Sequence, residues 1–116
     1  GDGRLDFTYI DDLVDGIIRS MAGFNGRGST NTFNITFGNA RTIKDLADVV
    51  QSVVPQAILE ERPRDEIKPI RGTLSVERAR SVLNFEPQWP LEVGYKRYCE
   101  WYVDQWERTK HRLAQN

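Results

Sequence analysis

Four stretches of the chain repeat apolar residues at the spacing of one face of an α-helix. Leu13, Ile17 and Met21 mark the first stretch, and aromatic residues from Tyr95 to Trp106 mark the last. The pattern predicts helices over about residues 12–22, 43–54, 76–83 and 91–111. Each start carries a residue that suits a helix N-terminus: Asp11 or Asp12, Thr42 with Asp45, Ser75, and Pro90.

Three shorter stretches favour extended chain, over residues 7–10, 31–37 and 57–60. In the second of them, Phe33, Ile35 and Phe37 alternate with polar residues, which is typical of a half-buried strand. Strands that alternate with helices predict the α/β class. Several helices with one apolar face each would have to pack against a sheet of only three short strands. This indicates that further strands normally lie beside it.

Three glycines interrupt the pattern within residues 23–29. A glycine-rich loop that cradles phosphate follows a strand and opens a helix, whereas this stretch follows a predicted helix and precedes a predicted strand. We therefore interpret it as a helix stop and a turn.

Length and composition narrow the class of protein. The chain has 116 residues, a net charge of −1, 39% hydrophobic and 28% charged residues, which is typical of one folded domain. This charge gives no general attraction to nucleic acid or anionic membranes, and no apolar run approaches the ~20 residues that cross a bilayer. The chain starts at Gly1 and its only methionine is Met21, so we expect a processed chain or a fragment of a longer protein.

Residues that often carry catalysis are scarce. The single histidine, His111, lies in a charged tail, and the single cysteine, Cys99, lies on the aromatic terminal helix, where a buried packing role is expected. One cysteine forms no internal disulfide and fits a reducing compartment. Asp11, Asp12 and Asp15 could gather around a hard cation, but a helix N-terminus favours the same residues, so we prefer capping.

A charged loop over residues 61–66 offers an anion site. It places Arg62 and Arg64 on either side of Pro63. Guanidinium groups bind phosphate in a bidentate way, although solvated surface charge is the ordinary alternative for such a loop.

Five short motifs follow one another along the chain. They are Gly1-Asp2-Gly3 with Asp6-Phe7-Thr8-Tyr9-Ile10-Asp11-Asp12, Phe33-Asn34-Ile35 with Thr42-Ile43-Lys44-Asp45-Leu46, Arg62-Pro63-Arg64-Asp65, Leu83-Asn84-Phe85-Glu86-Pro87, and Leu91-Glu92 with Trp101-Tyr102. In this order and spacing they resemble the C-terminal part of the NAD-dependent epimerase/dehydratase family, the extended short-chain dehydrogenases. The resemblance runs from Gly1 to about Trp106.

The resemblance implies a fold and a substrate class. The expected fold is the substrate-binding portion of a protein with an NAD(P)-binding Rossmann-like domain, with few short strands and about four helices. The expected substrate is a nucleotide sugar. Arg62 matches the family's phosphate-binding arginine, Asn34 an asparagine on the nucleotide side of the substrate, and Asp65 the acidic position of the same turn.

The chain departs from the family pattern at three positions. Leu5 stands where many members have a second phosphate-binding arginine, and the neighbouring Arg4 is expected to point to the other face of an extended segment. We keep Arg4 as a candidate substrate residue. Arg64 replaces a turn glycine, and Ser75 replaces a common aspartate.

The family's catalytic elements are missing from this sequence. No tyrosine is followed by lysine four residues later, and no glycine-rich loop lies between a strand and a helix. We therefore expect NAD and the catalytic base to belong to an absent N-terminal part, and this chain alone to be inactive. The parent enzyme is expected to be a cytoplasmic homodimer that resembles UDP-glucose 4-epimerase, with transient oxidation of a sugar carbon by NAD.

Two alternatives stay open. Leu5 motivates an NADP-linked reductase of a substrate without a nucleotide. The chain could also be a stand-alone α/β binding module, in which the apolar faces of residues 13–21 and 95–106 would cover one another.

Overall fold

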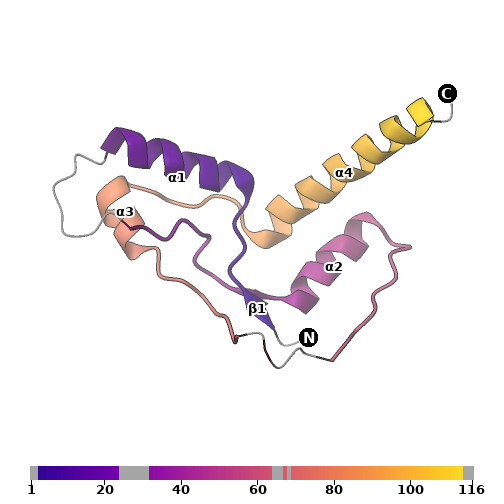
Figure 1. Cartoon of the computed structure of the whole chain (residues 1–116), viewed down its shortest axis with the longest axis horizontal. Helices are drawn as coiled ribbons and strands as arrows, with labels where there is room; N and C mark the ends of the chain where they lie inside the picture. Colours follow the sequence, from indigo (N-terminus) through magenta and orange to yellow (C-terminus); the bar gives the residue numbers. More distant parts are fainter. Residues whose placement is uncertain (1–2, 24–31, 64–66, 68, 114–116) are drawn as a thin grey trace.

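A computed structural model describes residues 3–23, 32–63, 67 and 69–113, with the side chains of 111–113 left aside. Its four helices form two pairs on either side of a two-stranded sheet, as Figure 1 shows: α1 (Ile10–Gly23) lies beside α3 (Glu77–Leu83), and α2 (Ile43–Val53) lies beside α4 (Leu91–Leu113). The C-terminal half of α4 extends away from the rest of the chain. The four predicted helices are thus confirmed, with shifts of a few residues at their ends.

The sheet differs from the prediction. Strand β1 (Arg4–Leu5) pairs antiparallel with β2 (Arg41–Thr42), with Arg4 opposite Thr42. Residues 7–9 form the extended entry to α1, which was one of the two expectations for the stretch at 7–10. The strands predicted over residues 31–37 and 57–60 are wrong, because a strand needs a hydrogen-bonded neighbour and the sheet of the described residues contains only β1 and β2. In the second stretch the predicted alternation of burial holds only from Phe33 to Ile35, which are partly buried on either side of the exposed Asn34, and it ends at Thr36, which is buried.

The capping box predicted at residues 42–45 is confirmed. The Thr42 hydroxyl accepts a hydrogen bond from the Asp45 backbone amide at 3.0 Å, and the Asp45 carboxylate accepts one from the Thr42 amide at 2.8 Å. This amide, followed by the Thr42 hydroxyl, lowers the pKa of Asp45 below its ordinary value. The box fixes the point at which β2 turns into α2.

Two predicted caps are wrong. Helix α1 starts earlier than expected, because the Leu13 amide already bonds to the Tyr9 carbonyl, so Asp11 and Asp12 lie inside its first turn. The N-cap of α3 is Val76, and the preceding Ser75 only accepts a 3.4 Å hydrogen bond from the Glu77 amide. The predicted glycine-rich turn lies mostly outside the described residues.

The small core lies between α3 and the extended segment at residues 32–37. Ala79, Leu83 and Phe85 are almost completely buried, and Phe33 and Ile35 pack against them. Helix α1 closes over this core through Gly16, where an added Cβ would lie 2.5 Å from Ile35 Cγ2. The absence of a side chain at this position therefore lets α1 approach the segment.

Asp12 attaches the other end of α1 to the connector before α4. Its carboxylate is buried and accepts hydrogen bonds from the backbone amides of Gln88 at 2.8 Å and Trp89 at 3.0 Å. Tyr9 lies against the Trp89 ring, with centroids 4.9 Å apart, and touches Gly94 of α4. Both carboxylate oxygens of this aspartate thus bond to the backbone of the connector.

Large apolar side chains are exposed on two helices. They include Leu13, Ile17 and Met21 of α1, which are 38%, 50% and 81% exposed, and Tyr98, Trp101 and Trp106 of α4, which are 45%, 55% and 58% exposed. The two faces do not cover one another, which contradicts the packing expected of a stand-alone module. In the part of the chain that the structure describes, no helix combines the length and apolarity of a membrane span.

Candidate functional site

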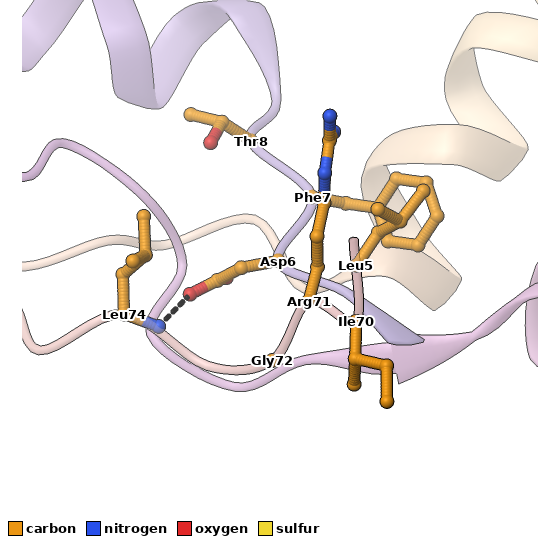
Figure 2. A pocket seen from close by; sticks show the side chains of 8 residues that line it. All are labelled: Leu5, Asp6, Phe7, Thr8, Ile70, Arg71, Gly72 and Leu74. Atoms are coloured by element: carbon orange, nitrogen blue, oxygen red, sulfur yellow. Dashed lines mark hydrogen bonds between the residues drawn. The ribbon is translucent and has the colours of Figure 1, made fainter. Parts of the chain in front are cut away.

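An open hollow lies where the chain leaves β1. It is lined by residues 5–8 on one side and by residues 70–74 on the other, with a volume of about 600 Å³ (Figure 2). Ligand pockets commonly fall between 300 and 1,000 Å³, so the hollow is large enough for a small-molecule group. Its lining residues are Leu5, Asp6, Phe7, Thr8, Ile70, Arg71, Gly72 and Leu74.

Asp6 joins the two walls of this pocket. One carboxylate oxygen accepts the hydrogen bond of the Leu74 amide and that of the Thr36 hydroxyl, and the other accepts the Gly38 amide, each at 3.0 Å. Figure 2 shows the bond to Leu74 across the pocket. Three separate segments therefore meet at one carboxylate.

A second bond holds the same wall. The Thr73 hydroxyl accepts a hydrogen bond from the Ala40 amide at 2.9 Å. Thr73 is thus attached to Ala40 and Leu74 to Asp6, although residues 73 and 74 belong to a stretch without helix or strand. The pocket wall is positioned by side chain–backbone bonds.

Among the residues that the structure describes, Arg71 is the one cation that lines the pocket. Its side chain rises from residues 70–74 toward the wall formed by Phe7 and Thr8 (Figure 2). No carboxylate of the described residues pairs with this guanidinium, and Asp6, the one acid in the described part of the lining, already accepts three hydrogen bonds. The pocket thus offers unused positive charge beside the apolar Leu5 and Phe7.

The predicted site residues do not gather in this pocket. Arg62 is exposed, and its guanidinium binds the Glu60 carboxylate through two 3.1 Å hydrogen bonds. Asn34 donates a 2.9 Å hydrogen bond to the Ser75 carbonyl, and Arg4 donates a 3.4 Å bond to the Ala40 carbonyl. Asp65 lies outside the described residues.

The expectation for Arg4 and Leu5 is confirmed. Leu5 lines the pocket, while Arg4 is outside its lining and bonds to Ala40 instead. Neighbouring residues of a strand point to opposite faces, which explains why Arg4 lies outside the described lining of this pocket.

Sequence reasoning missed Asp6 and Arg71 as pocket residues. Asp6 belongs to a quoted motif, but its partners at residues 36, 38 and 74 are distant in sequence. Arg71 precedes Gly72 in a stretch without periodicity, and no local pattern indicates that it lies opposite Leu5.

Cys99 has the inert character that its position predicts. It is buried on α4, and burial, followed by the charge of Glu100, raises the pKa of its thiol. A raised pKa keeps the thiol protonated near neutral pH and disfavours a nucleophilic role. The side chain of His111 lies outside the described residues.

A second, smaller hollow of about 360 Å³ lies between α1 and α4. Its lining combines Tyr9, Ile10, Tyr98 and Trp101 with Arg97. The Arg97 guanidinium lies 4.9 Å from the Trp89 ring centroid and 3.8 Å from the Asp11 carboxylate, so its charge already has local partners.

Comparison with known proteins identifies homologues of this chain. The UDP-glucuronic acid decarboxylase 4 of Arabidopsis thaliana is 33% identical over 97 residues, which cover 81% of this chain and 21% of the relative. The UDP-glucuronate 4-epimerase 1 of the same plant is 28% identical over 123 residues, covering 94% of this chain and 28% of the relative. The chain is a homologue of the nucleotide-sugar epimerases and decarboxylases. No family model matches it.

The structure of this chain is similar to solved structures of enzymes. The epimerase Mth375 of Methanothermobacter thermautotrophicus superposes with a TM-score of 0.80 at 24% identity, over 96% of this chain and 33% of that chain. The enzyme WbmF of Bordetella bronchiseptica, solved with NAD+ and UDP, superposes with a TM-score of 0.72 at 23% identity, over 99% and 33%. These matches confirm the extended short-chain dehydrogenase fold. The chain spans about a fifth to a third of the length of these homologues and neighbours.

Proposed function

We propose that this chain is the substrate-side part of an NAD-dependent enzyme that acts on a nucleotide sugar. The observation that carries the proposal is the similarity to UDP-glucuronic acid decarboxylase over 81% of the chain. The open pocket at residues 5–8 and 70–74 supports it, because the substrate side of such an enzyme has to hold an anionic ligand.

We also propose that NAD is held outside this chain. Dinucleotide binding uses a glycine-rich turn between a strand and a helix. Neither strand of the described residues is followed by a glycine-rich turn that opens a helix, so these residues do not fit the cofactor. The role left for this chain is to bind and orient the substrate, and we expect no turnover from it alone.

The homologues narrow the substrate within this proposal. Their names specify UDP-glucuronate, and they divide between decarboxylation and C4 epimerisation. We therefore favour a UDP-uronic acid over the UDP-glucose that the motifs alone suggested. Arg62 and Asn34, together with Asp65 and Arg4, remain predicted substrate residues, and homodimeric assembly and cytoplasmic location remain predictions.

One observation favours a second candidate. Leu5 gives the pocket an apolar side chain, which would suit an NADP-linked reductase whose substrate carries no nucleotide. A substrate screen of the intact protein separates the two candidates, since the first requires a diphosphate in every accepted substrate. Activity on substrates without a diphosphate, and none on nucleotide sugars, would favour the reductase.

Calorimetry tests where the cofactor is held. The proposal predicts that the 116-residue chain does not bind NAD, whereas the intact protein does. Tight NAD binding by the chain alone would contradict it.

A further inference from the structure

We infer that Arg71 binds the phosphate groups of the substrate in the pocket between residues 5–8 and 70–74. The inference rests on the proposed function and adds a residue to it that no sequence motif indicates. It concerns the pocket lining, in which Arg71 lies opposite Leu5 and Phe7.

The charges of the pocket point to an anion. In the lining that the structure describes, Arg71 contributes the positive charge, and no described carboxylate neutralises it. Asp6 contributes the negative charge of these residues, but both of its oxygens accept hydrogen bonds from residues 36, 38 and 74. An incoming phosphate would therefore meet a guanidinium without a carboxylate partner among the described residues. A guanidinium can donate two parallel hydrogen bonds to a phosphate group.

The backbone near Arg71 is held in place before any ligand binds. Two and three residues further along, Thr73 bonds to Ala40 and Leu74 bonds to Asp6. A side chain that starts from an anchored segment loses less freedom on binding than one on an unattached loop. The anchoring favours Arg71 as a binding residue, and one of the two anchoring bonds is the bond from Leu74 to Asp6.

Arg62 offers a contrast. It does not line this pocket, and both bonds of its guanidinium go to Glu60. A phosphate at Arg62 would have to replace the Glu60 carboxylate, whereas Arg71 has no carboxylate partner among the described residues. The two arginines thus make separable contributions, and Arg71 is the one in contact with the pocket.

Calorimetry on the intact protein tests the inference with three probes, namely UDP, inorganic pyrophosphate and uridine. We expect Arg71→Gln to weaken the binding of UDP and of pyrophosphate by about 10- to 100-fold, which is the effect of losing a hydrogen bond to a charged group. Uridine has no phosphate, so its affinity should change less than twofold. Arg71→Lys keeps the charge but loses the planar guanidinium, so its affinity for UDP and pyrophosphate should lie between those of the unchanged protein and of Arg71→Gln.

The control is Arg108→Gln. Arg108 is an exposed arginine of α4 that pairs with Asp104 at 2.9 Å and is outside the pocket lining. The Arg108→Gln protein loses the same charge as Arg71→Gln, but at a position outside the pocket. It should therefore bind all three probes like the unchanged protein. The thermal midpoint of Arg71→Gln should equal that of the control, because an exposed side chain without a partner contributes little to stability.

The outcomes separate the inference from the proposed function. If Arg71→Gln binds UDP and pyrophosphate within twofold of the unchanged protein, or if the unchanged protein binds neither, the inference is overturned. The proposed function still stands in those cases if the intact protein converts a nucleotide sugar. Pyrophosphate binding that depends on Arg71, without conversion of any nucleotide sugar, supports the anion site and contradicts the proposed function.

Discussion

The Asp6 carboxylate accepts a hydrogen bond from the Leu74 backbone amide at 3.0 Å, between residues 68 positions apart in sequence. The same carboxylate binds the Thr36 hydroxyl and the Gly38 amide. This aspartate therefore joins the end of β1 to residues 36–38 and to Leu74 in the opposite wall of the pocket.

Replacing Asp6 should damage both stability and the pocket. We expect Asp6→Ala to lower the free energy of unfolding by about 2–3 kcal/mol, because three donors lose a charged acceptor. Thr36→Val removes one of these donors and should cost about 1 kcal/mol. Urea denaturation of the intact protein measures both, and equal losses for the two variants would contradict the joining role of Asp6.

Asp12 and Asp11 provide a matched pair on α1. Asp12 is buried and binds two backbone amides, whereas Asp11 is exposed and lies 3.8 Å from Arg97. We expect Asp12→Ala to lower the free energy of unfolding by about 1.5–3 kcal/mol, and Asp11→Ala to lower it by less than about 0.5 kcal/mol. The thermal and urea midpoints of the two variants check the difference, and a larger loss for Asp11→Ala would show that the connector before α4 is held in another way.

Gly16 should resist substitution although it lies in a helix. Alanine normally favours a helix over glycine by about 1 kcal/mol. Here its Cβ would lie 2.5 Å from Ile35 Cγ2, so we expect Gly16→Ala to destabilise the protein by about 1–3 kcal/mol. Gly72→Ala is the control, because nothing lies within 4 Å of the added atom. A Gly16→Ala protein that is as stable as the unchanged one would contradict the close packing of α1.

Arg62 is predicted to contribute to substrate binding on the strength of its motif. We expect Arg62→Ala in the intact protein to weaken binding of the accepted nucleotide sugar by about 1.5–3 kcal/mol. The Michaelis constant across candidate nucleotide sugars is the measurement. A constant that does not change would indicate that the bond between Arg62 and Glu60 is only a surface ion pair.

The helices could be predicted because their causes are local. The Thr42–Asp45 capping box and the apolar spacing of residues 43–53 lie within one short stretch, and the structure confirms both. The strands could not be predicted in the same way, because pairing depends on a neighbour. Residues 32–37 alternate as a strand should, yet no described strand lies beside them.

The candidate site was predictable only in part for the same reason. The motif around Asp6 indicated the family, which the homologues confirm. The pocket itself arises from contacts across long stretches of sequence, from Asp6 to Leu74 and from Ala40 to Thr73. Since Arg71 reaches the pocket through these contacts, the residues near it in sequence do not indicate its position.

The central claim is that this chain holds a nucleotide sugar within an NAD-dependent enzyme. Its most direct test is to incubate the intact protein with NAD and UDP-glucuronate and to identify the products by NMR and mass spectrometry. We predict a new UDP-sugar, formed either by inversion at C4 or by loss of carbon dioxide, and no product from the free sugar acid. If UDP-glucuronate and other nucleotide sugars all remain unchanged while a substrate without a diphosphate is reduced, the claim is contradicted.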